Sequence, residues 1–112
     1  MTQQIGLIDL AKEMGVRKIV KLSAIGAETG SILHIADWHG QIEDHLKTSG
    51  LDYINLRPHS LVQNMLMHLG SIKSQNCFYE SVGNTKIPMI DTRDVAQASF
   101  DCLMKDEVNS KT

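Results

Sequence analysis

The stretch VRKIVKLSAIGA (residues 16–27) decides the fold of this 112-residue chain. Its first half is rich in Val and Ile and predicts a strand over 17–23, and the small residues after it predict a loop. The pattern returns in LDYINLR (51–57), which predicts a second strand. Pro58 ends that strand because proline has no N–H to donate to a ladder.

Apolar residues at helical spacing occupy most of the chain between and around these strands. They predict helices over 3–14, 36–49, 60–73 and 92–105, with Asp91 as the N-cap of the last. The third helix has the clearest apolar stripe, formed by Val62, Met65, Leu66, Leu69 and Ile72.

Two short strands are also predicted, over 77–82 and 86–90, around a turn at Gly83 and Asn84. Helices that alternate with strands indicate an α/β fold in which right-handed crossovers make the main strands parallel. Such a sheet would be very small, with an exposed apolar edge at 17–23. We therefore expect the chain to self-associate, or to need a partner that covers this edge.

The composition is that of an ordinary globular domain, with 42% hydrophobic residues and 21% charged residues. With 11 basic and 13 acidic residues, the net charge of -2 offers no basic field for nucleic acid. No apolar run approaches the roughly 20 residues that cross a bilayer, and the N-terminus lacks the features of a signal peptide. We expect a single domain over 1–112 that is cytoplasmic and has no membrane or nucleic-acid partner.

Small residues follow the first strand, beginning with Ser23 and Ala24. Ligands of open α/β sheets bind outside the carboxyl ends of the strands, where a serine can hydrogen-bond a substrate oxygen. The alternative is a turn of small residues that only lets the chain leave the sheet. Both interpretations are compatible with the spacing.

His39 lies near the start of the second predicted helix, on its apolar side. An imidazole there can donate, accept or transfer a proton, or it can be a half-buried side chain satisfied by a carbonyl or water. The five histidines form no H-x-x-x-H pair, and Cys77 and Cys102 lie more than four residues from any histidine. We therefore predict no metal site.

Arg57 follows the second strand and so falls on the same edge as Ser23. It can pair with a phosphate or carboxylate ligand, or with Asp91 or Asp94 and tie the last helix to the sheet. The two cysteines have no evident activating cation, so neither is a predicted nucleophile.

Three blocks of the sequence resemble one known family. They are GVRKIVKLSAIGAE, HGQIEDHLKTSGLDYINLRPHSLVQNML and IPMIDTRDVAQASFDCL, which together span about 15–105. They are similar to the NmrA-like, NAD(P)-binding branch of the atypical short-chain dehydrogenase/reductase superfamily. The resemblance implies a partial Rossmann-like parallel sheet with flanking helices.

Members of that family are roughly twice as long. The resemblance covers only their C-terminal half, so the N-terminal strands and the glycine-rich phosphate loop are expected to be missing here. The sequence contains no G-x-G-x-x-G motif. The resemblance thus implies NAD(P) as cofactor, and this chain alone is expected to bind it poorly.

Active members of the superfamily use a Tyr-x-x-x-Lys pair on the helix after the fifth strand. Aligned on Glu43, the tyrosine position is Ile35 and the lysine position is His39. Isoleucine cannot transfer a proton, so the resemblance implies no catalytic residue in this chain. Any hydride transfer would resemble the reduction of a small quinone-like substrate.

The resemblance also implies which residues contact the nicotinamide end of the cofactor. Ser23 and Ala24 would lie beside the nicotinamide, Pro58 and His59 would line the other wall, and His39 would contact the ribose. We expect an NAD(P)-binding oxidoreductase-like protein that is truncated and weak or inactive alone. The alternatives are a non-catalytic regulator that senses cofactor or binds a protein, and a truncated product without independent function.

Overall fold

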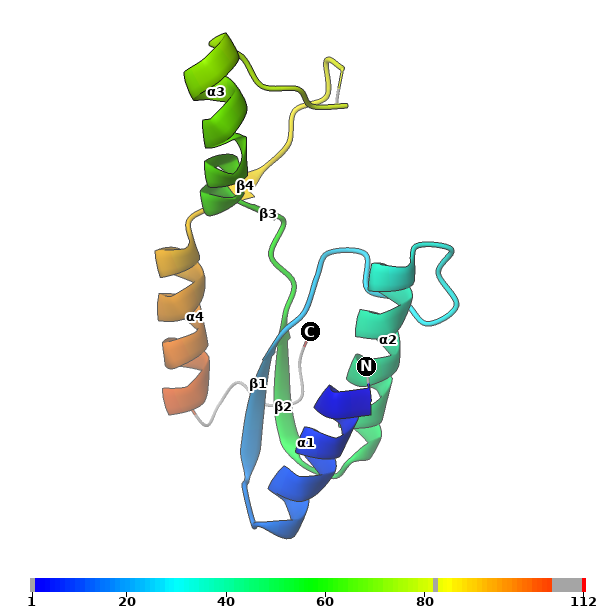
Figure 1. Cartoon of the computed structure of the whole chain (residues 1–112). Helices are drawn as coiled ribbons and strands as arrows, with labels where there is room; N and C mark the ends of the chain where they lie inside the picture. Colours follow the sequence, from blue (N-terminus) through cyan, green and yellow to red (C-terminus); the bar gives the residue numbers. More distant parts are fainter. Residues whose placement is uncertain (1, 82, 106–111) are drawn as a thin grey trace.

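The computed structural model describes residues 2–81, 83–105 and 112. Its main body has three layers: α4 covers one face of a two-stranded sheet, and α1 and α2 cover the other (Figure 1). A smaller lobe around α3 projects from the carboxyl ends of the strands (Figure 1). In chain order the elements are α1 (Thr2–Glu13), β1 (Lys18–Leu22), α2 (His34–Thr48), β2 (Asp52–Leu56), β3 (Ser60–Leu61), the 3₁₀ helix η1 (Val62–His68), α3 (Leu69–Gln75), β4 (Met89–Ile90) and α4 (Thr92–Met104).

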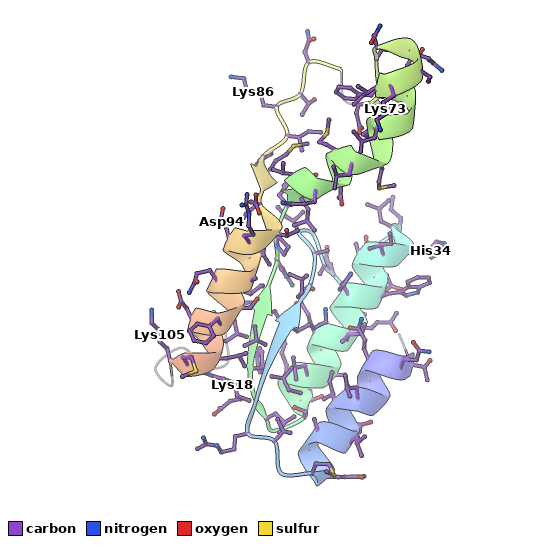
Figure 2. All side chains as sticks on the ribbon, turned by 60° about the vertical axis from the view of Figure 1, so that its left-hand side comes forward. Lys18, His34, Lys73, Lys86, Asp94 and Lys105 are labelled. Carbon is purple, nitrogen blue, oxygen red and sulfur yellow. The ribbon has the colours of Figure 1, made fainter. Side chains whose placement is uncertain are left out.

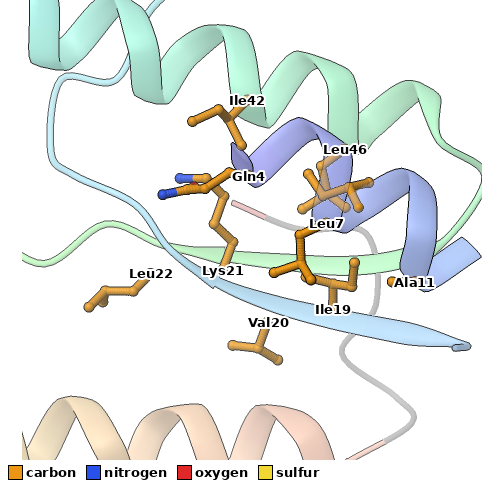
Figure 3. Close-up of a pocket in the computed structure, with 10 residues that line it drawn as sticks. Gln4, Leu7, Ala11, Ile19, Val20, Lys21, Leu22, Ile42 and Leu46 are labelled. Atoms are coloured by element: carbon orange, nitrogen blue, oxygen red, sulfur yellow. The ribbon is translucent and has the colours of Figure 1, made fainter. Parts of the chain in front are cut away.

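Strands β1 and β2 pair in parallel, with Lys18 opposite Asp52 and Leu22 opposite Leu56. The predicted α/β class and the parallel pairing are confirmed. Side chains alternate between the two faces of a strand, and β1 shows this clearly. Lys21 points toward α2, whereas Val20 points toward α4 (Figure 3).

The apolar core lies over the amino-terminal half of the sheet. Ile8 of α1 packs there against Ile42 and Leu46 of α2, and Ile19 of β1 and Tyr53 of β2 pack against this cluster. Gly15 has a φ of 76°, a conformation in which glycine has no steric penalty, and this lets the chain turn from α1 into β1. The opposite face of the sheet buries Ile54 of β2 and Val95 of α4.

The predicted helix over 60–73 is wrong at its start. Residues Ser60 and Leu61 are extended because they pair in parallel with Met89 and Ile90, which lie far from them in the sequence. The chain then continues as η1 and only afterwards as α3. None of the five residues of the predicted apolar stripe is fully buried: Met65 and Ile72 are half-buried and the other three are exposed.

The two short strands predicted over 77–82 and 86–90 are also longer than what the structure shows. Residues 77–81 are irregular, residue 82 lies outside the described residues, and of 86–90 only Met89–Ile90 is a strand. The turn at Gly83 and Asn84 is confirmed. Among the described residues, no helix combines the length and apolar character required to cross a membrane.

Candidate functional site

Helix α2 presents two kinds of side chain to the sheet. Its C-terminal half contributes Ile42 and Leu46 to the apolar core, whereas Glu43 and His39 lie over the carboxyl-terminal half of the sheet. The polar residues that meet them come from both strands and their ends. We call this group the polar layer: Lys21, Ser23, His39, Glu43, Asn55 and Arg57.

Glu43 is the centre of the polar layer and has no exposed surface. Its Oε1 accepts hydrogen bonds from Ser23 Oγ at 2.5 Å and from Arg57 Nε at 3.0 Å, and its Oε2 accepts from a second Arg57 nitrogen. Burial by itself raises the pKa of Glu43, but the hydrogen bonds from Arg57 and Ser23 outweigh it and hold this pKa below the ordinary value. Glu43 is therefore a buried carboxylate that joins the ends of both strands to α2.

The two interpretations of Arg57 can now be compared with its observed partner. Arg57 pairs with Glu43, and not with Asp91 or Asp94 as one alternative predicted. Asp91 instead caps α4 by accepting from the backbone N–H of Arg93 at 2.8 Å. The cap prediction is confirmed, and the proposed tie between Arg57 and the last helix is wrong because α2 supplies a nearer carboxylate.

Lys21 and His39 form a second pair, with 2.9 Å between Nζ and Nδ1. Lys21 is only 7% exposed, and this burial lowers its pKa. Burial and the neighbouring Lys21 ammonium also lower the pKa of His39, because both disfavour the imidazolium. At neutral pH this site therefore combines an ammonium with a neutral imidazole.

Asn55 lies beside Lys21 in the sheet register and is also buried. Its Nδ2 donates to Thr112 Oγ1 at 3.1 Å, while its Oδ1 has no partner among the described residues. A buried carbonyl oxygen without a donor costs free energy, so this atom is available to a ligand or water that reaches the polar layer.

The structure brings several of the predicted site residues together. Ser23 is buried and engaged by Glu43, and Ala24 is half-buried beside it. The backbone N–H of Ile25 donates to the carbonyl of Pro58 at 3.3 Å, which joins the loops that follow β1 and β2. These loops form one rim at the carboxyl ends of the strands, as expected from the parallel pairing.

The two predicted histidines differ in their surroundings. His39 lies in the polar layer, whereas His59 is exposed on the rim. The assignment of these histidines, Ser23, Ala24 and Pro58 to cofactor binding stays a prediction. Among the described residues there is no group of three side chains that could hold a metal ion.

Sequence reasoning missed Lys21 and Asn55 and used Glu43 only as an alignment marker. A signal for the first two exists, because each is a polar residue at an inward-facing position of an otherwise apolar strand. The burial of Glu43 carries no such signal. It depends on the tertiary contact with Arg57 and Ser23, which lie 14 and 20 residues away.

A groove of about 530 Å³ runs along the open side of β1, between α1 and α2. Lys21 reaches into it toward Gln4 and Ile42 (Figure 3). Its other walls are mostly apolar. They are formed by Leu7, Ile8, Ala11, Ile19, Val20, Leu22 and Leu46.

Parallel strands, helices on both faces and a polar layer at the carboxyl ends define an α/β protein of the Rossmann-like class. The chain belongs to the NAD(P)H-binding family, whose sequence profile matches residues 1–106. It is 33% identical over 99 residues to an NAD(P)H azoreductase from Xenophilus azovorans, an alignment that covers 88% of this chain and 35% of the relative. It is also 33% identical over 102 residues to festuclavine synthase II from Penicillium roqueforti, with 88% and 34% covered.

A solved structure from Bacillus halodurans, of the NAD-dependent epimerase/dehydratase class, has the same fold. The superposition has a TM-score of 0.66 at 21% identity and covers 97% of this chain and 50% of that one. The chain thus spans about a third of the length of the curated relatives and half of this structural neighbour. The expectation that the chain corresponds to part of a Rossmann-like fold is confirmed.

Proposed function

We propose that the chain forms the nicotinamide side of an NAD(P)H site in an oxidoreductase-like protein. The observation that carries this proposal is the polar layer at the carboxyl ends of β1 and β2, in a chain of the NAD(P)H-binding family. One free donor and one free acceptor fit a sugar and a carboxamide: His39 Nε2 can donate, Asn55 Oδ1 can accept, and neither has a partner among the described residues. The cofactor would supply the hydride, and the chain would orient it. A cytoplasmic location, as expected from the sequence, is part of this proposal.

The substrate proposed for this site is a small quinone-like acceptor. A mostly apolar hollow of about 480 Å³ adjoins the rim and is lined by Ala24, Ile25, Leu33, His34, Ile35 and Ala36. Such a surface suits a flat conjugated molecule. One relative is named an NAD(P)H azoreductase, which supports a reduction as the reaction class. Ile35 cannot transfer a proton, so protons would have to come from water, from His34 in the lining of the hollow, or from His39.

A titration of the 112-residue chain tests the proposal. We expect no micromolar affinity for NADPH, because the sequence has no glycine-rich loop to hold the pyrophosphate. Reduced nicotinamide mononucleotide at millimolar concentration should shift the amide NMR signals of Ser23, Ala24 and His39. Adenosine monophosphate is the matched control and should leave these signals unchanged.

The possible outcomes separate the alternatives. Micromolar NADPH binding by calorimetry would contradict a partial site. If several millimolar of the nicotinamide ligand moved none of the three signals, the proposed function would be wrong. The second candidate, a non-catalytic regulator, is favoured by Ile35 and requires ligand binding without any NADPH oxidation in the presence of menadione.

A further inference from the structure

The hydrogen bond between Lys21 and His39 defines which imidazole nitrogen carries the proton. A lysine ammonium has three N–H donors and no acceptor, so His39 Nδ1 must accept from Lys21 Nζ. A neutral imidazole that accepts at Nδ1 carries its proton on Nε2. Among the described residues, none accepts a hydrogen bond from this second nitrogen.

The charges around His39 come from all three elements that meet in the polar layer. Lys21 projects from β1, Glu43 lies one turn further along α2, and Arg57 follows β2. Both oxygens of Glu43 are already engaged by Ser23 and Arg57, which leaves Lys21 as the charged group in hydrogen-bond contact with the imidazole. Burial of the ring is the larger cause of its lowered pKa, and Lys21 is the charged group that adds to it by direct contact.

We propose that Lys21 is a positioning residue that holds His39 as a neutral imidazole with its Nε2–H available to an oxygen acceptor of the ligand. The ammonium behind the ring also polarises this N–H and strengthens the hydrogen bond that it donates. The acceptor class is a sugar hydroxyl or a carbonyl oxygen. Its assignment to the cofactor ribose rests on the proposed function, whereas the role of Lys21 does not.

The arrangement also selects against the charged imidazole. Protonation of Nδ1 would place an N–H against the Lys21 ammonium, so the hydrogen bond would be lost and two cations would be in contact. His39 consequently stays neutral down to a pH below the ordinary histidine value of roughly 6.5. A histidine without this lysine would be partly charged in the same range.

Long-range ¹H–¹⁵N NMR of the whole chain, titrated with pH in the absence of ligand, tests the proposal. In the wild type, His39 should show a protonated Nε2, a hydrogen-bonded unprotonated Nδ1 and a pKa below that of a free histidine. Lys21→Met should remove the Nδ1 hydrogen-bond signature and raise the His39 pKa, because the neighbouring cation is gone. Lys21→Arg, which keeps a charged donor, should restore most of the wild-type behaviour.

Lys18→Met is the matched control. Lys18 lies on the same strand but on the opposite face, where its ammonium donates to the carbonyls of Cys102 and Lys105 (Figure 2). Removing it should leave the His39 pKa unchanged. If Lys21→Met perturbs folding, Lys21→Gln keeps a neutral donor and should give an intermediate His39 pKa.

Two results would overturn the role of Lys21: a proton on His39 Nδ1 in the wild type, or a His39 pKa that Lys21→Met does not move. The hydrogen bond from His39 Nε2 to a ligand is tested separately with reduced nicotinamide mononucleotide. Lys21→Met and His39→Leu should each weaken its binding several-fold, and the double variant should be no weaker than His39→Leu. If the wild type binds none of this ligand while the tautomer is as expected, the proposed function fails and the positioning role stands.

Discussion

Glu43 shows how a charge can be buried in so small a protein. Its three hydrogen bonds come from Ser23 and Arg57, so each of its oxygens has a donor. Breaking a buried pair by removing one partner leaves the other charge or donor unsatisfied, which costs far more than an exposed ion pair contributes. The junction of the two strand ends with α2 therefore depends on this one carboxylate.

Glu43→Gln should lower the free energy of unfolding by about 3 kcal/mol, because the amide cannot accept all three bonds and leaves Arg57 without its counter-charge. Urea denaturation followed by circular dichroism measures this change. Glu13→Gln is the control at an exposed position of α1 and should change stability by less than about 0.5 kcal/mol. Equal effects at both positions would contradict the central role of Glu43.

The same carboxylate makes the free energy of unfolding depend on pH. The pKa of Glu43 is lower in the folded chain than its ordinary value of about 4.3, so the unfolded chain binds the proton more tightly. The contribution of Glu43 is therefore complete above that ordinary value and is lost as the pH falls through the folded pKa. Between pH 7 and pH 3, the wild type should lose more stability than Glu43→Gln, and parallel losses in urea denaturation would contradict this.

The sequence predicts the role of a single residue when its partner lies close to it in the sequence. The cap at Asp91 was predictable because its partner, Arg93, lies two residues away. The partner of Arg57 was not, because three acidic side chains can be reached in principle and only the packing of α2 selects Glu43. For the same reason, His39 could be nominated from its helix position, whereas its contact with Lys21 could not.

At the scale of elements, α2 is held close to the loop that follows β1. A Cβ on Gly40 would collide with the backbone of Glu28 and Thr29. The loop is also tied to the helix by Thr29 Oγ1, which donates to Asp44 Oδ2 at 2.7 Å. Gly40 is thus required for the close approach that places the rim over the polar layer.

Gly40→Ala should destabilise the chain by roughly 2–3 kcal/mol, since the obstacle is backbone and cannot rotate away. Gly6→Ala is the control in α1, where an added Cβ meets nothing within 4 Å and should stabilise the exposed helix by up to about 1 kcal/mol. Thermal unfolding should show opposite shifts for the two variants. A Gly40→Ala variant as stable as the wild type would mean that the loop does not lie against α2.

The elements predicted well from the sequence are those whose apolar side packs against the rest of the main body. The predicted ranges for α1, α2, α4 and the main strands differ from the structure by one or two residues. The segment over 60–73 has an equally clear helical pattern, yet its first two residues pair with β4 and no residue of its apolar stripe is fully buried. Periodicity identifies an amphipathic segment but does not show what will cover it.

At the scale of the whole molecule, much apolar surface has no cover. In the described part of the chain, seven apolar residues are buried, whereas twenty large ones are exposed. The N–H of Ser23 donates to Leu56 and that of Asp52 to Arg17, so alternate peptide groups of β1 face β2. The peptide groups between them face the open edge beside the groove, which makes β1 a template for pairing with another strand.

We expect a second copy of the chain to pair along this edge, so that the sheets join and the apolar groove is covered. Sedimentation velocity should show a dimer or larger species at micromolar concentration. Leu7→Lys should weaken this association, because Leu7 lines the groove and is 65% exposed, so a charge there would have to be buried between the two copies. Met67→Lys is the control, since Met67 is 84% exposed but belongs to η1; a wild type that remains monomeric would contradict the expectation.

The two hydrogen bonds from Lys18 to the end of α4 have a consequence for the order of folding. They join positions 84 and 87 residues apart, which is most of the length of the chain. Contacts of such long sequence separation form late, because a long loop must close before they contribute. The face of β1 that packs on α4 is therefore expected to be covered later in folding than the face that packs on α1 and α2.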